Sequence, residues 1–350
     1  MAAAFFAGAF FAAAFLAGAF FFATAFLAGA FFFAAAFLAG AFLATAFLAG
    51  AFFFATGFLA VAFFPRGVSL AAGFFFAGGS MVVAFIFGGV IAFLVERTDT
   101  PLRNFAYSIM FIPLILPSVL KAIGWVLLLG PSNGVLNKIW LSLGFTEPLF
   151  NAYSIPAMFW VEGLSMAPLT FLLLGAALRG MDPSLEEAAA VSGANRWWTC
   201  ARVGLPLVGP AVLGGSIYHF MTALSMFEVP AMLGAAGGQS PVLATELFYS
   251  VRPATGEATM VSYGAAGVYG VVIAAPSLVA LYFYHRVLEK SHRFAVISGK
   301  GYRPHAHDLG KFKYPAFGFA ILYIMLAAVM PMLVLGWMSL FPYVHMPSIA

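Results

Sequence analysis

Long apolar stretches that recur between short polar segments are the feature that most restricts how this chain can fold. A helix that crosses a bilayer core of about 30 Å needs about 20 residues of this kind. Six stretches meet that length: Phe74–Val95, Phe105–Leu129, Ile155–Leu178, Val208–Leu233, Ser262–Tyr284 and Tyr314–Leu340. We therefore expect an all-α fold, a polytopic transmembrane helix bundle embedded in a lipid bilayer.

The composition agrees with a membrane location. Charged residues make up 8% of the 350 residues and hydrophobic residues make up 63%, whereas soluble domains have about 25% charged residues. The net charge of +4 gives no reason to expect nucleic acid as a partner, because basic residues in a membrane protein set its topology. The single cysteine, Cys200, excludes an internal disulfide.

The loops between the apolar stretches alternate in their content of basic residues. The loops at 96–104, 179–207 and 285–313 hold two, three and seven Lys or Arg residues, respectively. The intervening loops, 130–154 and 234–261, hold one each, Lys138 and Arg252. The positive-inside rule predicts that the first group of loops lies in the cytoplasm and the second group outside.

Residues 1–64 form an uncharged tandem repeat in which AFLAG, or a near copy, returns every ten or eleven residues. A helix with this sequence would be apolar on all sides, so it belongs in lipid, and the segment could hold two or three spans. The absence of charge argues against a cleaved signal peptide. We expect no specific function for this repeat, since it offers no polar group for chemistry.

A polar segment, Glu186–Pro210, interrupts the apolar pattern on the cytoplasmic side. Asp182 or Ser184 suits a helix N-cap, with acidic residues in the first turn. We expect one short helix up to Ser192, a left-handed turn at Gly193 and a second short helix over Asn195–Arg202. The segment is therefore predicted to protrude as a helix–turn–helix.

The spacing within this segment resembles the EAA loop of ABC importer permeases. The match consists of Glu187, Ala188 and Ala189, then Gly193, then Val203, and finally Leu205 and Pro206, with Val203 where the family has Ile. The resemblance implies a permease-type bundle whose cytoplasmic loop docks into a groove of a separate ABC ATPase. Movement of the ATPase pair would then displace the loop as a lever.

Three further stretches resemble the branch of these permeases that imports ferric iron: Leu94–Pro101, Pro113–Trp125 and Met226–Gly234. The resemblance implies a periplasmic substrate-binding protein that delivers ferric iron to the outer loops. Related branches import thiamine, polyamines and phosphonates, which remain alternative substrates. Permeases of the iron branch usually carry two similar halves in one chain.

Only one EAA pattern occurs here, whereas an importer needs two. We expect a permease module at 65–287, a basic cytoplasmic linker at 288–313 and, at 314–350, the first span of a second half that has been cut short. A second permease half or copy is the expected partner.

Ionisable residues inside spans are costly, so each one is a candidate for the translocation path. Glu228 lies before Pro230 near the outer end of a span; it serves either as a path or gating carboxylate with oxygen ligands for a hard metal, or as a structural hydrogen-bonding group. Glu162 either lines the path or pairs with Lys121, and the pair is favoured. Lys121 could instead extend toward the surface. His219 is interpreted as a packing residue rather than a ligand.

Motifs that are absent from the sequence exclude some classes of function. The chain has no P-loop and no zinc-protease motif, so we expect a transport subunit without catalytic residues, cofactor or resident metal, which depends on a separate ATPase. An ATPase-independent channel or secondary transporter is the rival hypothesis, with only Glu162, Glu228 and Lys121 available for an ion relay. A non-functional fragment is the third.

Overall fold

The computed structural model describes residues 70–101, 103–148, 151–181, 188–189, 191–194, 199, 202, 204–234, 242–251, 263–291 and 309–340. The N-terminal repeat and the spans expected within it lie outside these residues. Every regular element in the described part is a helix, as the sequence predicts.

The first half of the described chain contains α3 (Leu70–Ala84), a π-helical turn η2 (Phe85–Gly89), α4 (Val90–Arg97), α5 (Arg103–Ile115), α6 (Ser118–Leu129), α7 (Val135–Ser142) and α8 (Ile155–Arg179). The second half contains α11 (Leu205–Ser225), α12 (Glu228–Leu233), α13 (Leu243–Val251), α14 (Tyr263–Ser291), η5 (Gly310–Phe312), α15 (Lys313–Ile324), η6 (Met325–Val329) and α16 (Met330–Ser339).

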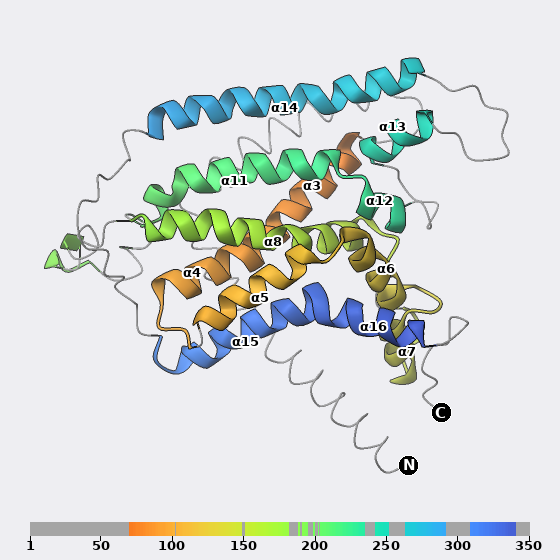
Figure 1. Cartoon of the computed structure of the whole chain (residues 1–350), viewed down its shortest axis with the longest axis horizontal. Coiled ribbons are helices and arrows are strands. Elements are labelled where there is room, and N and C mark those ends of the chain that lie inside the picture. Colours follow the sequence, from red (N-terminus) through yellow and green to blue (C-terminus); the bar gives the residue numbers. More distant parts are fainter. Residues whose placement is uncertain are drawn as a thin grey trace, which may run out of the picture.

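Five helical segments in the described part are long and apolar enough to cross a membrane: Ala72–Arg97, Ile155–Arg179, Leu207–Ser225, Ala266–Arg286 and Lys313–Ser339. The long helices run side by side, with α14 at one edge of the bundle (Figure 1). The segment Lys313–Ser339, built from α15, η6 and α16, is named the C-terminal span below.

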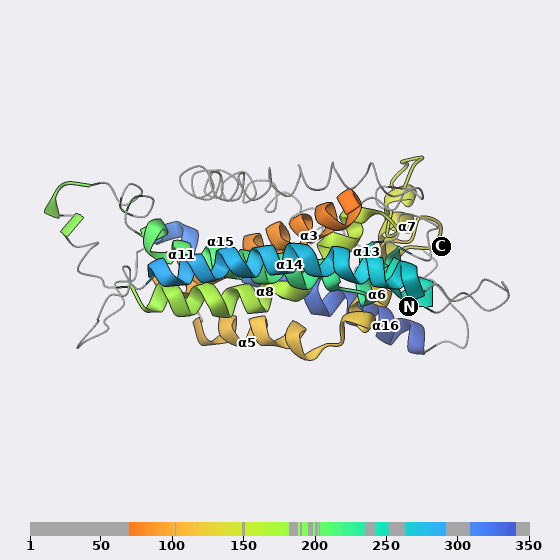
Figure 2. The ribbon, with the colours of Figure 1, turned by 90° about the horizontal axis from the view of Figure 1, so that it is seen from above.

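Helix α8 is the centre of the bundle. Figure 2 shows α3 and α5 on opposite sides of it, and α11 also packs against it. The crossing with the first span depends on glycine: a Cβ added to Gly88 would lie 2.1 Å from the carbonyl oxygen of Ala167, and one added to Gly163 would lie 2.4 Å from Cβ of Val83. Small residues thus allow the two backbones to approach closely, as is common between membrane helices.

The stretch Phe105–Leu129, predicted as one span, does not form a single straight helix. The chain breaks between α5 and α6 at Leu116 and Pro117, where the two helices meet at 92°. Proline lacks an N–H group and disfavours helical geometry in the residue before it. This stretch therefore supplies a sixth span only if the bent pair is counted as one.

The predicted span Val208–Leu233 is also interrupted. Helix α11 ends at Ser225, Met226 is extended, and α12 begins at Glu228. Pro230 therefore occupies the first turn of α12, where a missing N–H group costs nothing because that group has no helical partner. Glu228 opens a separate short helix instead of lying near the end of a long one.

Candidate functional site

The two ends of the segment that resembles an EAA loop lie next to each other. The segment leaves α8 after Arg179 and enters α11 at Leu205, with Pro206 in the first turn of that helix. Met181 is buried, and a Cβ added to Gly204 would lie 3.6 Å from its methyl carbon Cε. The segment is thus attached to two neighbouring membrane helices.

Gly193 adopts the left-handed backbone conformation that the sequence predicts, with φ of +79°. The N–H group of Ala194 donates to the carbonyl of Ala189 at 3.0 Å, and the N–H group of Ser192 donates to the carbonyl of Ala188 at 3.1 Å. This arrangement matches the Schellman motif, in which a left-handed glycine ends a short helix. Glu187, Val203 and nearly all of the second predicted helix lie outside the described residues.

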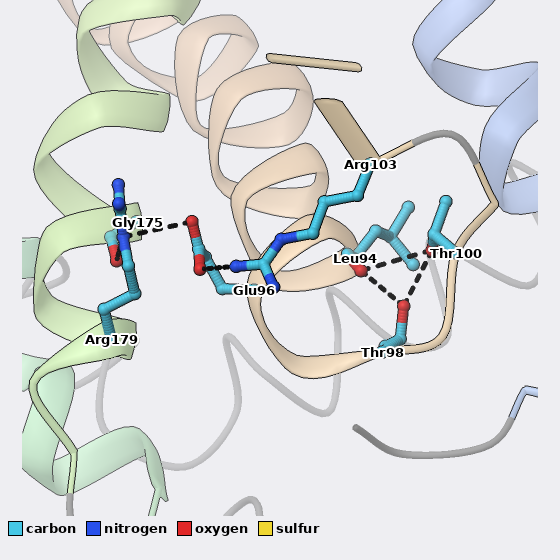
Figure 3. A network of polar contacts seen from close by, with 7 residues as sticks. All are labelled: Leu94, Glu96, Thr98, Thr100, Arg103, Gly175 and Arg179. Atoms are coloured by element: carbon cyan, nitrogen blue, oxygen red, sulfur yellow. Dashed lines mark hydrogen bonds and ion pairs between the residues drawn. The ribbon is translucent and has the colours of Figure 1, made fainter. Parts of the chain in front are cut away.

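A polar network joins α4, α5 and α8 at the end of the bundle from which this loop leaves (Figure 3). The Glu96 side chain is fully buried. Nη2 of Arg103 donates a hydrogen bond to Oε2 of Glu96 at 2.5 Å. Arg179 Nε lies 3.2 Å from Glu96 Oε1, in an ion pair without hydrogen-bond geometry. One carboxylate therefore faces two guanidinium groups from two other helices.

The turn that follows Glu96 is closed by its own hydroxyl groups. The Thr98 hydroxyl donates to the carbonyl of Leu94, the Thr100 hydroxyl donates to the same carbonyl at 3.2 Å, and the two threonine oxygens lie 2.7 Å apart. Further along, the carboxylate of Asp99 accepts a hydrogen bond from the N–H group of Leu309 at 2.9 Å. The turn thus contacts the chain just before the C-terminal span.

The three ionisable residues predicted for the translocation path come from α6, α8 and α12. Lys121 is buried and interacts electrostatically with Glu162 and Glu228. Its amine donates to the carbonyl of Pro113 at 3.1 Å, an oxygen that Pro117 leaves without a helical donor. Lys121 therefore does not extend to the surface.

Glu162 is fully buried, and neither of its carboxylate oxygens finds a hydrogen-bond partner within the part of the chain that the structure describes. Glu228 is exposed at the start of α12. The structure thus places Lys121 within electrostatic range of both carboxylates. No group of three or more described His, Cys, Asp or Glu side chains is arranged to hold a metal ion.

His219 is a satisfied packing residue, as predicted. It is fully buried, its Nδ1 donates to the carbonyl of Gly215 at 2.7 Å, and its Nε2 lies 2.9 Å from the hydroxyl of Thr170. The ring therefore links α11 to α8.

Two features escaped the interpretation of the sequence. The buried ion network around Glu96 lies in the Leu94–Pro101 stretch, which was singled out only for its resemblance to the iron branch. The second is the hydroxyl of Tyr323, which donates to the carbonyl of Leu164 at 3.0 Å and anchors the C-terminal span on α8. The sequence signal that could have indicated this contact is Pro168, a proline four residues beyond that carbonyl.

Comparison with known proteins agrees with this architecture. The family described as "Binding-protein-dependent transport system inner membrane component" matches residues 84–294, more than half of the chain. The chain belongs to this family. Its spanning helices and its family together place it in the inner membrane as a multi-pass protein.

The names of individual relatives specify different cargoes. The chain is 25% identical over 224 residues to the ferric transport system permease protein FbpB of Actinobacillus pleuropneumoniae, covering 64% of this chain and 31% of that protein. It is 30% identical over 148 residues to the molybdenum transport system permease protein ModB of Escherichia coli strain K12, covering 40% and 60%, respectively. The chain thus spans about a third of the length of the ferric relative.

A solved structure shares the fold. A chain of a bacterial alginate ABC transporter, in complex with an alginate pentasaccharide-bound periplasmic protein, superposes with a TM-score of 0.52 at 20% identity. The superposition covers 69% of this chain and 83% of that one. It supports the helical bundle and says nothing about cargo.

Proposed function

We propose that this chain is the transmembrane permease subunit of an ATP-driven ABC importer. The observation that carries the proposal is the position of the Gly193 segment, which is tethered where the ends of α8 and α11 meet. A partner that moves the segment acts on both helices at once. Family membership and the spacing Glu187 to Pro206 support the same role.

The partners follow from this role. ABC ATPase subunits would dock on the coupling loop, with Ala188, Ala189 and Gly193 in the first arm and Val203, Leu205 and Pro206 at its return to the membrane. ATP hydrolysis would occur on those separate chains, because this sequence has no P-loop. A periplasmic substrate-binding protein would deliver cargo to the outer loops.

Ferric iron is the proposed cargo. The resemblance of Leu94–Pro101 to the iron branch and the ferric relative support it. Glu228 and Glu162 offer the oxygen donors that a hard trivalent cation prefers. Thiamine, polyamine or phosphonate import remains the alternative, and a molybdenum permease also matches.

The C-terminal span would be the first span of a second permease half. It packs against α5, α6 and α8; Phe319 stacks on Phe87 with ring centroids 5.3 Å apart. A Cβ added to Gly124 of α6 would lie 2.6 Å from Pro331. This close fit is what a permanent half-to-half interface would require.

Co-purification of the ATPase tests the role of the loop. Wild-type chain should retain the ATPase, and Gly193→Pro should lose it, because proline cannot adopt a positive φ. Gly144→Pro is the matched control: Gly144 also has a positive φ, +97°, and lies in a loop predicted to be external. Failure of the wild type to bind any ATPase, with transport intact, would favour the ATPase-independent channel.

Uptake into proteoliposomes tests the cargo. Vesicles that contain the complex and the binding protein should accumulate radioactive ferric iron in the presence of internal ATP. Accumulation of labelled thiamine, spermidine, phosphonate or molybdate instead would replace iron as the cargo and leave the permease role in place.

A further inference from the structure

The inner turn, residues 96–101, has no part in the function proposed so far, yet it carries two long-range polar links. Glu96 faces Arg179, the last residue of α8. The Asp99 carboxylate accepts a hydrogen bond from the N–H group of Leu309, just before the C-terminal span. Two segments that are distant in sequence are therefore attached to one short turn.

The link to α8 is buried. The Glu96 side chain has no exposed surface, and its Oε1 lies close to Gly175, where an added Cβ would be 3.6 Å away. The carboxylate thus lies against α8 at Gly175. Arg179 is held from a second side as well, because its guanidinium carbon lies 5.5 Å above the Tyr107 ring, and that ring packs edge-on against Phe171.

The turn between these links is stiff. Thr98 and Thr100 both donate to the carbonyl of Leu94 and contact each other, so the two hydroxyl groups close the backbone on itself. Arg103 then holds Glu96 from the start of α5. A short segment that is closed internally and fixed at both ends can transmit a displacement instead of absorbing it.

We propose that the inner turn is a strut that makes the end of α8 and the start of the C-terminal span move as one body, with Glu96 and Asp99 as its positioning residues. The proposal rests on the proposed function, in which the coupling loop leaves α8 after Arg179. The strut would carry loop movement from the first permease half into the helix proposed to begin the second.

Distance measurements between spin labels test the strut. In a Cys200→Ser background, labels are placed at Ala176, exposed on α8, and at Phe312, which is 74% exposed at the start of the C-terminal span. The wild-type complex should give one narrow distance distribution that is the same without nucleotide and after trapping with ATP and vanadate. Asp99→Ala and Glu96→Gln should each lose the narrow peak.

The controls separate the possible causes. Glu147→Gln makes the same chemical change as Glu96→Gln at an exposed residue before Pro148, in the predicted outer loop, and should keep the narrow peak. Asp99→Ala breaks only the link to Leu309, so it decides the proposal even if Glu96→Gln fails to fold. Narrow, wild-type distributions in Asp99→Ala would overturn the strut.

The same samples distinguish this proposal from the proposed function. Absence of ATPase from the wild-type complex would refute the permease role. The nucleotide-free distances in the purified chain would still show whether the inner turn holds α8 and the C-terminal span together.

Discussion

The hydroxyl of Tyr323 donates a hydrogen bond to the backbone carbonyl of Leu164 at 3.0 Å, deep inside the bundle. In an unbroken helix this carbonyl would accept from the N–H group of residue 168, but that residue is Pro168 and has none. A side chain of the C-terminal span thus satisfies a backbone group that a proline in α8 leaves open.

Tyr323→Phe should therefore destabilise the protein, by about 1–3 kcal/mol, because a buried carbonyl loses its donor. The thermal unfolding midpoint in detergent measures the change. The matched background is Pro168→Ala, which restores an N–H group to the helix. In that background the same substitution should cost clearly less, and an equal cost in both backgrounds would contradict the explanation.

Gly88→Ala should weaken the crossing of the first span with α8. The new methyl group would lie 2.1 Å from the Ala167 carbonyl oxygen, and backbone cannot move aside as a flexible side chain can. Overpacking of this kind costs about 1–3 kcal/mol. Gly78→Ala is the control, because it lies on the same span and an added Cβ meets nothing within 4 Å; similar losses of stability in the two variants would argue against a tight crossing.

Glu162 and Lys121 should behave as a coupled pair in unfolding experiments. Each single substitution, Glu162→Gln or Lys121→Met, removes one charge and leaves the other buried without compensation. The loss of unfolding free energy in the double variant should be smaller than the sum of the two single losses, by about 1 kcal/mol or more. Additive effects, with loss of transport in folded Glu162→Gln, would instead assign Glu162 to the translocation path.

Thr170→Val should loosen the contact between α8 and α11. The Thr170 hydroxyl faces Nε2 of His219 at 2.9 Å. Its loss leaves a buried ring nitrogen without a donor, because the Met166 carbonyl, 3.3 Å from Nε2, can only accept a hydrogen bond. We expect a cost of about 1 kcal/mol or more. Thr222→Val is the control, since its hydroxyl donates to the Tyr218 carbonyl of its own helix at 2.8 Å. A comparable loss of stability in Thr222→Val would contradict a special role of the contact with His219.

The sequence was sufficient to predict the helical membrane fold, because long apolar stretches have few alternatives in lipid. It also predicted the turn at Gly193, where only a residue without a Cβ adopts a positive φ easily. The packing role of His219 followed from its isolation on an apolar helix. These predictions rest on local physics, which the sequence displays directly.

Features that depend on contacts between distant segments were missed. The stretch Phe105–Leu129 was predicted as one span, but it bends by 92° at Pro117, and α6 then packs against α12 and α16. The burial of Glu96 likewise depends on Arg179, more than eighty residues later in the chain. Sequence spacing alone contains no information about such partners.

The carbonyls that Pro117 and Pro168 leave open have a consequence for how this chain changes over time. Lys121 fills the first opening and Tyr323 fills the second. Loss of either donor while its proline remains leaves a buried carbonyl without a partner, whereas replacement of the proline returns a backbone N–H group to that carbonyl. Each proline and its donor should therefore be gained and lost together among relatives, as inherited pairs and not as independent sites.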